Sequence, residues 1–363
     1  MDLLFNDCSI TGQLLIVPQN ERTFIEDMKE FNFSEARSIK LKAVMGYDKH
    51  RVVTHGVCVS DMVIDGFEYL FCKGLLNKEE IDAMVLVTSS PDHFLPPTTA
   101  IIHGALGLKE DMLCLDITQG CCGYIVGLIQ AFSLLNQPSI KKIAVVTADV
   151  LSRKVSKKDR NSYPLIGDAA SISIVERNYK SNVVRGNIKI DGSKNNALMI
   201  PAGGFRTPST PETALLEDSG DNNYRSKNNL VMDGSAVFNF VMEKTPPMIK
   251  DLLEKSGMTL NDIDFFLFHQ PNRFMLEKLA DDMNVPHSKM PNNVVETYGN
   301  SSGTTIPAVI ALNLSNEICA NSYKVCFAGF GVGLTWTSLL LDFGPMDFCE
   351  TLEFTSADHG DKF

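Results

Sequence analysis

Three side chains of this sequence could together carry out nucleophilic chemistry at a thioester. Cys121 follows a Gln-Gly turn, His269 directly follows the apolar run 263–268, and Asn300 follows Gly299 at the start of a predicted helix. A cysteine thiolate attacks acyl carbon, a histidine transfers protons, and an asparagine amide holds a carbonyl oxygen. Taken together, these residue types indicate a site that handles thioesters.

Cys121 in particular lies where a thiol could become a thiolate. An apolar run at 112–115 predicts a strand before it, and the apolar segment 125–135 predicts a helix after it. The free N–H groups and the positive dipole end of a helix N-terminus favour the anion and lower a thiol pKa. Structural alternatives stay open for each residue taken singly, since cysteine fills cores, strand-end histidine is often held by packing, and asparagine often caps helices.

The elements that must position these residues occur twice in the same order. Each half begins with a strand and a helix, passes through a turn into a second helix, and ends on a strand. This alternation predicts largely parallel sheets covered by helices, and the repetition predicts two similar α/β halves packed together. The predicted elements are 81–87, 99–106, 112–115, 125–135 and 143–147 in the first half, and 263–268, 274–283, 305–314 and 325–328 in the second.

We expect the chain to divide into four parts. Residues 1–180 form the first half with Cys121, and residues 231–345 form the second half with His269 and Asn300. Between them, 181–230 is rich in Asn, Gly, Ser and Pro, which predicts an irregular excursion of the kind that forms lids or dimer contacts. For the acidic tail 346–363, the sequence leaves open whether it packs or is disordered.

Composition excludes several classes of function. The chain has 363 residues, enough for a large core, and its formal net charge of −11 provides no basic excess for nucleic acid or an anionic membrane. Nine cysteines without a CxxC pair predict neither a disulfide framework nor a zinc site, and the other histidines lack metal-ligand spacing. The apolar stretch 325–341 is broken by glycines, which favours two buried strands around a turn over a membrane span. With no signal peptide expected, we predict a cytoplasmic protein that binds no metal.

Seven stretches of the sequence resemble the β-ketoacyl-acyl carrier protein synthase III family of condensing enzymes, within the thiolase-fold superfamily. They occur in the family's order, and no single one would be as specific as the set. The resemblance implies a thiolase-like α/β fold, with two similar αβαβα-layered halves in one compact unit, and a homodimer. The stretches are 116–124, 147–151, 166–170, 232–238, 269–272, 298–302 and 330–336.

The resemblance also implies a role for each candidate. Cys121, not its neighbour Cys122, would be the nucleophile, and His269 and Asn300 would complete a triad. The backbone N–H groups of Cys121 and Val332 would form an oxyanion hole. Val332 stands where the family has a glycine, so its side chain narrows the approach.

By the same resemblance, the protein is a 3-oxoacyl-ACP synthase III-like acyltransferase of fatty acid biosynthesis and lipid metabolism. An acyl-CoA or acyl-ACP would acylate Cys121, and decarboxylation of malonyl-ACP would then supply the enolate that attacks the acyl group. Acyl carrier protein is the expected partner, and no cofactor is expected. Two alternatives stay open: an acyltransferase that makes an ester or amide on a sugar or secondary metabolite without decarboxylation, and a non-catalytic subunit. The retained triad disfavours the second alternative.

Candidate binding residues follow the family less closely. Arg160 matches a coenzyme-contacting arginine, but Lys40 and Val44 stand where the family has the Trp and Arg that hold adenine, so an acyl carrier protein is favoured over coenzyme A as donor. Other predicted contacts are Asn272, Arg273 as a carrier-docking arginine displaced by one position, and Leu95, which would shape the acyl pocket unless the Pro-rich loop 93–97 is only a turn.

Overall fold

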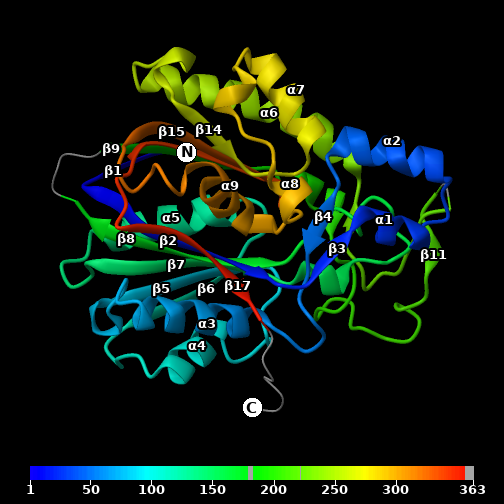
Figure 1. The fold of residues 1–363 in the computed structure, drawn as a ribbon, viewed down its shortest axis with the longest axis horizontal. Helices are drawn as coiled ribbons and strands as arrows, with labels where there is room; N and C mark the ends of the chain where they lie inside the picture. The colour runs from blue at the N-terminus through cyan, green and yellow to red at the C-terminus, as the bar shows by residue number, and fades with distance from the viewer. Residues whose placement is uncertain (179–182, 221, 356–363) are drawn as a thin grey trace.

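Two mixed β-sheets form the frame of the protein. The structure, a computed structural model, describes residues 1–178, 183–220 and 222–355. In Figure 1 the two sheets lie one above the other, and helices cover their faces. Several short elements gather at one end of the molecule, on the right in Figure 1, outside the two large sheets.

The first large sheet has the spatial strand order β17-β2-β8-β7-β5-β6. All residues of β5 are apolar or β-branched and buried, as expected for a strand covered on both faces. The strands are β2 (Cys8–Pro18), β5 (Ala83–Thr88), β6 (Leu113–Thr118), β7 (Lys142–Asp149), β8 (Ala169–Arg177) and β17 (Phe348–Phe354).

The second large sheet has the order β1-β9-β16-β15-β14. β15 and β16 form an antiparallel hairpin, so the longest apolar stretch consists of two buried strands around a turn, as the sequence predicted. The strands are β1 (Asp2–Asn6), β9 (Val183–Ile190), β14 (Phe265–Phe268), β15 (Tyr323–Gly331) and β16 (Thr335–Phe343). Three short pairs lie apart from both sheets: β3 (Glu21–Thr23) with β4 (Lys49–Arg51), β10 (Leu198–Met199) with β13 (Val231–Met232), and β11 (Glu217–Asp218) with β12 (Tyr224–Arg225).

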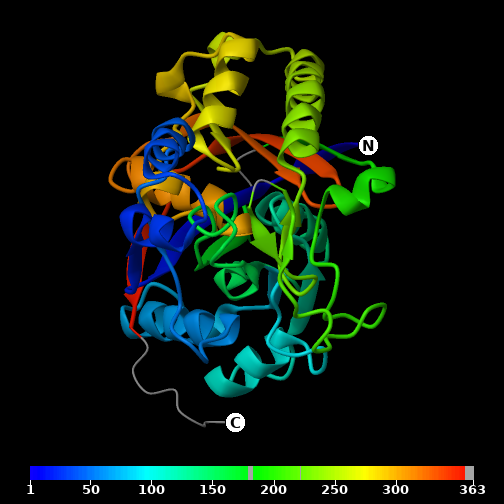
Figure 2. The same cartoon turned by 90° about the vertical axis from the view of Figure 1, so that its right-hand side faces the viewer.

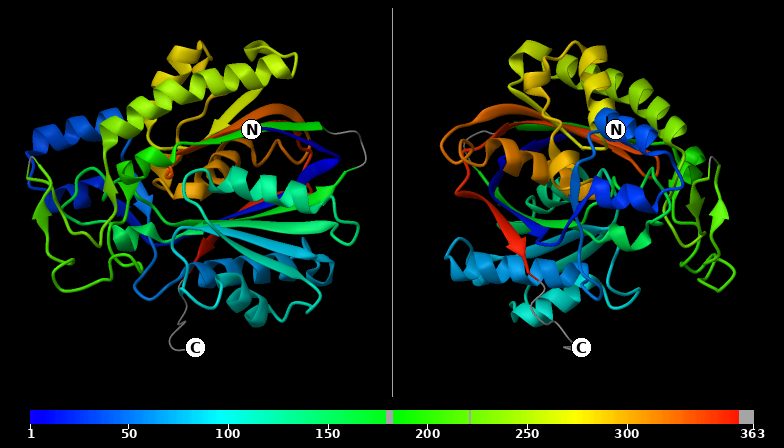
Figure 3. Two further views of the ribbon diagram at one scale, coloured as in Figure 1. Left: turned by 180° about the vertical axis from the view of Figure 1, so that it is seen from behind. Right: turned by 45° about the vertical axis from the view of Figure 1, so that its right-hand side comes forward.

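The helices complete five layers, which confirms the expected αβαβα arrangement. α3 and α4 cover the outer face of the first sheet, α6 with α7 covers the outer face of the second, and the apolar helices α5 and α9 lie between the sheets (Figures 2 and 3). The helices are α1 (Phe24–Asp27), α2 (Glu35–Met45), α3 (Val59–Cys72), α4 (Thr98–Leu106), α5 (Gly123–Leu134), α6 (Gly234–Lys255), α7 (Arg273–Met283), α8 (Val294–Thr297) and α9 (Thr305–Leu314).

Both sheets are mixed: the prediction of largely parallel sheets holds for the first sheet, in which three of the five described strand pairs are parallel, and is wrong for the second, in which one of four is. β5 pairs in parallel with β6 and β7, and β14 pairs in parallel with β15. The pairs β7–β8 and β15–β16 are antiparallel, because the chain returns after β7 and β15 without a crossover α-helix.

The two halves of the chain also exchange their edge strands. β1 and β9 belong to the second sheet, while β17 pairs with β2 of the first. The expected boundaries near residues 180 and 345 therefore do not separate two independent units. The region 181–230 was expected to be irregular but contains β9, and the tail 346–363 contributes β17; residues 179–182 and 356–363 lie outside the described residues.

Each gap between layers holds a hydrophobic core cluster. Phe132 and Phe327 lie between the two sheets, Phe67 lies under α3, and Phe240 lies under α6. A fourth cluster around Phe24 packs the end of the molecule that carries α1 and α2. The candidate catalytic turns are thereby fixed between rigid, closely packed layers.

We expect the C-terminal strand to contribute to global stability. Phe348 is buried and its ring lies directly over Gly12, which leaves no room for a side chain there. Phe348→Ala should lower the free energy of unfolding by about 3 kcal/mol through lost burial and a cavity. Thr351→Ala, at an exposed position of the same strand, should change it by less than about 0.5 kcal/mol. Equal urea midpoints for the two variants would show that β17 is not part of the cooperative unit.

Candidate active site

The loops at one edge of the two sheets enclose a cavity of about 240 Å³. Cys121, Asn300, Ser302 and Val332 lie in its polar part, and the rest of its wall is mainly aliphatic. The aliphatic wall includes Leu198, Met199, Ile200 and Leu230. The segment 181–230, which the sequence predicted to be an irregular excursion, therefore forms part of the cavity wall. An apolar chamber with a nucleophile and an amide at one end suits the acyl end of a thioester.

Cys121 sits on the turn between β6 and α5, as predicted. The Cys121 thiol lies close to the backbone of Gly331. A side chain at position 331 would place its Cβ only 2.8 Å from Cys121 Sγ. The backbone N–H groups of Cys121 itself and of Val332 both point to the sulfur, and so does the Ser302 hydroxyl. The two amides expected to form the oxyanion hole therefore lie beside the sulfur that would carry the acyl group.

The pKa of the Cys121 thiol is raised to about 11, mainly because burial disfavours the thiolate. The backbone donors and the Ser302 hydroxyl lower the pKa but do not outweigh burial, and the nearby Asp149 carboxylate raises it further. The backbone N–H groups lower the thiol pKa, as expected at a helix N-terminus, but burial outweighs them and the net shift is upward, contrary to the expected thiolate. The thiol proton must therefore be removed by a neighbouring group when the sulfur attacks.

Ser302 connects the three candidate catalytic residues. Its hydroxyl reaches Cys121, its N–H donates to Asn300 Oδ1 at 2.9 Å, and its carbonyl interacts with the His269 ring. The residue holds a left-handed backbone conformation, with φ of +57°, which costs a residue with a side chain about 1–2 kcal/mol. Sequence reasoning did not single out Ser302, although it lies within the 298–302 stretch.

Asn300 is held by its backbone as well as by Ser302. Its N–H donates to Leu165 O at 2.7 Å, and its carbonyl accepts from Gly167 N at 3.2 Å. These two hydrogen bonds make an isolated parallel β-bridge between Asn300 and Ile166. Because Oδ1 already accepts the Ser302 N–H, the Nδ2 group is what Asn300 offers to the cavity. Such a fixed amide donor can hold a developing negative oxygen.

His269 is buried at the end of β14, with its ring against Phe330 at 5.7 Å between centroids. Burial lowers the pKa of the imidazole to about 3, so the ring is neutral near pH 7. Its Nδ1 lies 2.6 Å from Thr305 Oγ1. A neutral imidazole has one nitrogen able to accept a proton, which the buried thiol requires.

A buried carboxylate that sequence reasoning did not select stands behind the nucleophile. Asp149 ends β7, and its Oδ1 accepts from the N–H and hydroxyl of Ser89, each at 2.8 Å. The Ser302 hydroxyl also interacts with it, so Ser302 lies between Asp149 and Cys121. Burial raises the pKa of Asp149 to about 6, and above that pH its charge opposes thiolate formation.

Arg160 belongs to a second polar group. Its guanidinium lies over the Phe33 ring at 4.5 Å, and Arg37 approaches the same ring at 5.7 Å. The sequence comparison with the family found no counterpart of the adenine-binding residues at Lys40 and Val44, whereas the structure brings Phe33 and Arg37 to Arg160. Guanidinium groups beside an aromatic ring are suited to a flat base and phosphates.

None of the four predicted binding residues, Arg160 included, lines the cavity. Asn272 caps α7 by accepting from Met275 N at 2.9 Å, and Arg273 pairs with Glu296. Leu95 is 83% exposed. It lies on a surface loop and not in the acyl cavity, so within one chain the structure does not give it the predicted pocket role.

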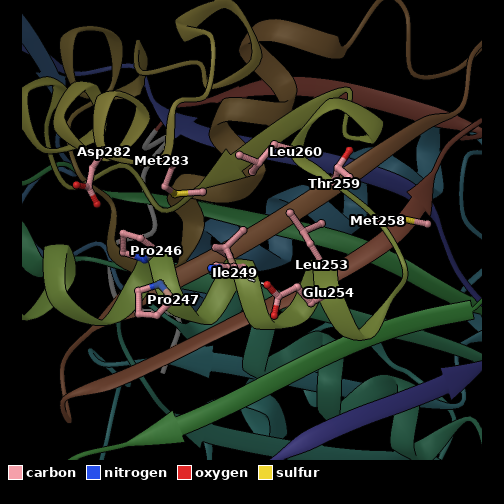
Figure 4. Close-up of a pocket in the computed structure, with 11 residues that line it drawn as sticks. Pro246, Pro247, Ile249, Leu253, Glu254, Met258, Thr259, Leu260, Asp282 and Met283 are labelled. Carbon is pink, nitrogen blue, oxygen red and sulfur yellow. Dashed lines mark ion pairs between the residues drawn. The ribbon is translucent and has the colours of Figure 1, made fainter.

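A larger cavity lies elsewhere, between α6 and the end of α7. It measures about 590 Å³, and Figure 4 shows Pro246, Leu253 and Met283 among its walls. None of the candidate catalytic residues lines it, so its size does not make it the reaction site.

Neither a metal site nor a spanning helix emerges from the described residues. Within them, no group of three or more His, Cys, Asp or Glu side chains is arranged to hold a metal ion. No helix in those ranges is long and apolar enough to cross a membrane.

The chain is similar in sequence to one family of known proteins. The family model described as 3-oxoacyl-[acyl-carrier-protein (ACP)] synthase III matches residues 115–192, and the model of its C-terminal part matches 253–343. A Campylobacter jejuni protein provisionally named 3-oxoacyl-[acyl-carrier-protein] synthase 3 is 30% identical over 94% of this chain and 96% of its own length. The β-ketoacyl-[acyl-carrier-protein] synthase III of Streptococcus uberis is 31% identical over 81% of this chain and 87% of its own.

A solved structure confirms the thiolase-like fold. The crystal structure of a 3-oxoacyl-(acyl-carrier protein) synthase from Burkholderia xenovorans superimposes with a TM-score of 0.90 at 28% identity. It covers 98% of this chain and 99% of its own. The similarity therefore includes the exchanged edge strands and the segment that closes the cavity.

Replacing Asp149 should make Cys121 more reactive. Asp149→Asn removes the negative charge that raises the pKa of the thiol, so the thiol pKa should fall and alkylation by iodoacetamide between pH 7 and 10 should be faster, by about tenfold for each unit of pKa. Asp168→Asn removes another buried carboxylate, bound by Ser152 and Val53, and serves as the control. Unchanged or slower alkylation of Asp149→Asn alone would contradict this electrostatic account.

Proposed function

This chain belongs to the 3-oxoacyl-[acyl-carrier-protein] synthase III family, and we propose that it joins an acyl group to malonyl-acyl carrier protein by decarboxylative condensation. The observation that carries the proposal is that Cys121, His269 and Asn300 each contact Ser302, which lines an apolar cavity together with Cys121 and Asn300. The relatives reported above are named as synthases of this reaction type, so ester or amide formation is not favoured.

In the first half-reaction, Cys121 takes the acyl group from its donor. The neutral His269 accepts the thiol proton, Sγ forms a bond to the thioester carbon, and the oxyanion lies at the N–H groups of Cys121 and Val332. The carbonyl re-forms as the bond to the carrier sulfur breaks, and the carrier leaves as a thiol with the proton. The acyl chain then lies in the cavity, against its aliphatic wall.

In the second half-reaction, malonyl-acyl carrier protein loses carbon dioxide. The electron pair of the broken carbon–carbon bond forms an enolate, whose oxygen is placed beside the Asn300 amide and the His269 ring. The enolate carbon attacks the acyl group on Cys121 and displaces the thiolate, which is then protonated. The predicted triad thus serves both steps with no added cofactor.

We propose coenzyme A as well as acyl carrier protein as a donor. Phe33, Arg37 and Arg160 form an aromatic and cationic group that suits the nucleotide end of coenzyme A. This revises the preference for a carrier protein that the sequence alone suggested. The acceptor, by family membership, remains malonyl-acyl carrier protein, and the pathway is fatty acid biosynthesis.

We further propose a homodimer, supported by an open edge of the first sheet. Among the described strands, β6 pairs only with β5, and most of its side chains are aliphatic or β-branched and partly exposed. An exposed apolar cluster lies on nearby loops, where the Phe94 and Phe205 rings meet at 5.2 Å beside Leu95. Unprotected apolar edge strands invite pairing with a second copy. A cytoplasmic location is proposed as well, since no pair of cysteines forms a disulfide among the described residues.

The catalytic proposal predicts a covalent acyl-enzyme on one thiol. With acyl-CoA the intact protein should gain the mass of one acyl group, and added malonyl-acyl carrier protein should release carbon dioxide and a 3-oxoacyl product. Cys121→Ala should lose acyl uptake and reduce kcat by about 10³-fold or more. Cys122→Ala, which removes the buried neighbouring thiol, should keep acyl uptake. An ester or amide formed without carbon dioxide would refute condensation.

The dimer proposal predicts that a charge on the β6 edge weakens association. Leu113 is 38% exposed on β6, and Leu113→Lys should raise the dimer dissociation constant by about tenfold or more in analytical ultracentrifugation. Leu4→Lys places the same charge on β1, at the edge of the other sheet, and should leave association unchanged. Equal dissociation constants for both variants would place the interface elsewhere.

A further inference from the structure

Behind Asn300, on the side away from the cavity, lies a buried pair of polar side chains, His50 of β4 and Asp27 of α1. The His50 ring lies between two oxygen atoms, with Nδ1 2.6 Å from the carbonyl oxygen of Ile166 and Nε2 2.8 Å from Asp27 Oδ2. His50 is 1% exposed and Asp27 is 3% exposed. Neither residue lines the cavity, so neither is in a position to touch the acyl chain.

The two contacts fix the orientation of the His50 ring. A carbonyl oxygen can only accept a hydrogen bond, so Nδ1 carries a proton and donates it to Ile166 O. The contact at Nε2 requires one proton between the ring and the Asp27 carboxyl group, and either atom can carry it. Asp27 therefore holds the ring from one side, and the Nδ1–H group is directed at Ile166 on the other.

The partner of His50 is also the partner of Asn300. Ile166 forms the parallel β-bridge with Asn300 described above. On the other side of this bridge, the N–H of Arg51 donates to Tyr298 O at 3.0 Å. β4 is therefore hydrogen bonded to both segments of the bridge, to one through the His50 side chain and to the other through its backbone.

The packing around Gly299 couples His50 to Asn300 a second time. Gly299 has φ of +82°, and a Cβ there would lie 2.7 Å from His50 Cβ and 2.9 Å from Gly167 N. The residue before Asn300 thus lies directly against His50. Because closely packed segments shift together, a displaced His50 ring would also displace the Asn300 backbone.

We propose that His50 is a positioning residue for Asn300. Asp27 orients its ring, and the Ile166 carbonyl and Gly299 transmit its position. The inference rests on the proposed function for its kinetic consequence, since the Asn300 amide holds an oxygen in the second half-reaction. Misplacing this amide by about 1 Å should slow decarboxylation of malonyl-acyl carrier protein by about 10- to 100-fold and leave acyl uptake nearly unchanged.

Two variants of Asp27 test the orientation of the ring. In Asp27→Asn the amide N–H can donate to Nε2, so the Nδ1–H donor to Ile166 stays in place, whereas Asp27→Leu has a similar size and no hydrogen-bonding group. Asp27→Leu should slow carbon dioxide release by the preformed acyl-enzyme by about 10- to 100-fold. Asp27→Asn should slow it by less than about threefold, and acyl uptake by both variants should stay within about threefold of the wild type.

The effect of His50 should also depend on Asn300. His50→Phe keeps a flat buried ring, removes both nitrogens, and provides a second test should Asp27→Leu not fold. It should slow decarboxylation in the wild-type background but change the rate by less than about twofold in Asn300→Ala, because residues that act through one another are not additive. Phe348→Ala, which lowers stability away from the cavity, is the control and should leave both half-reactions unchanged.

The position of Asn300 can be measured without substrate as well. In ¹⁵N spectra of asparagine-labelled protein, the side-chain amide signals of Asn300, assigned by their loss in Asn300→Ala, should shift or broaden in Asp27→Leu and His50→Phe but not in Asp27→Asn. Unchanged signals in the first two variants, equal slowing of both half-reactions, or a full effect of His50→Phe in Asn300→Ala would overturn the proposal. If the signals change as expected but the wild-type protein releases no carbon dioxide, the proposed function fails while the positioning role stands.

Discussion

The left-handed turn at Ser302 is the constraint on which the site depends. Cys121, His269 and Asn300 come from segments far apart in the sequence, and each of them contacts Ser302. The backbone conformation costs about 1–2 kcal/mol and persists because the surrounding layers are closely packed. The strained backbone is therefore at the residue that contacts all three candidate catalytic side chains.

Burial dominates the electrostatics of this site. It raises the pKa of the Cys121 thiol and lowers the pKa of the His269 imidazole, so both groups are neutral near pH 7. It also raises the pKa of the Asp149 carboxyl group. A buried thiol does not react indiscriminately, and it becomes a nucleophile only when a base takes its proton. The apolar surroundings strengthen the fixed amide donors as well, because electrostatic interactions are stronger where the effective dielectric constant is low.

The exchange of edge strands explains how the site stays rigid although it lies between two halves. β1 and β9 join the second sheet and β17 joins the first, so neither half can separate without breaking strand pairs. The segment between the halves is tied down as well, because β10 pairs with β13 and both line the cavity through Leu198 and Met232.

The sequence by itself determined the elements and the candidate triad. The predicted strands and helices in both halves appear with boundaries shifted by a few residues, because apolar periodicity and turn residues are local signals. Cys121, His269 and Asn300 were selected in the same way, from their places at element ends, and their catalytic roles stay predictions that the proposed experiments test.

Only the tertiary structure decided the pairing of the strands and the surroundings of the site residues, since both depend on contacts between segments far apart in the sequence. Strand direction, the place of β9 and β17, and the thiol pKa follow from pairing and burial, which no short stretch of sequence records. Phe33 and Arg37 reach Arg160 from a helical region with no matching motif, and Leu95 points to the surface. Ser302 gains its importance only because the fold brings it to Cys121 and His269.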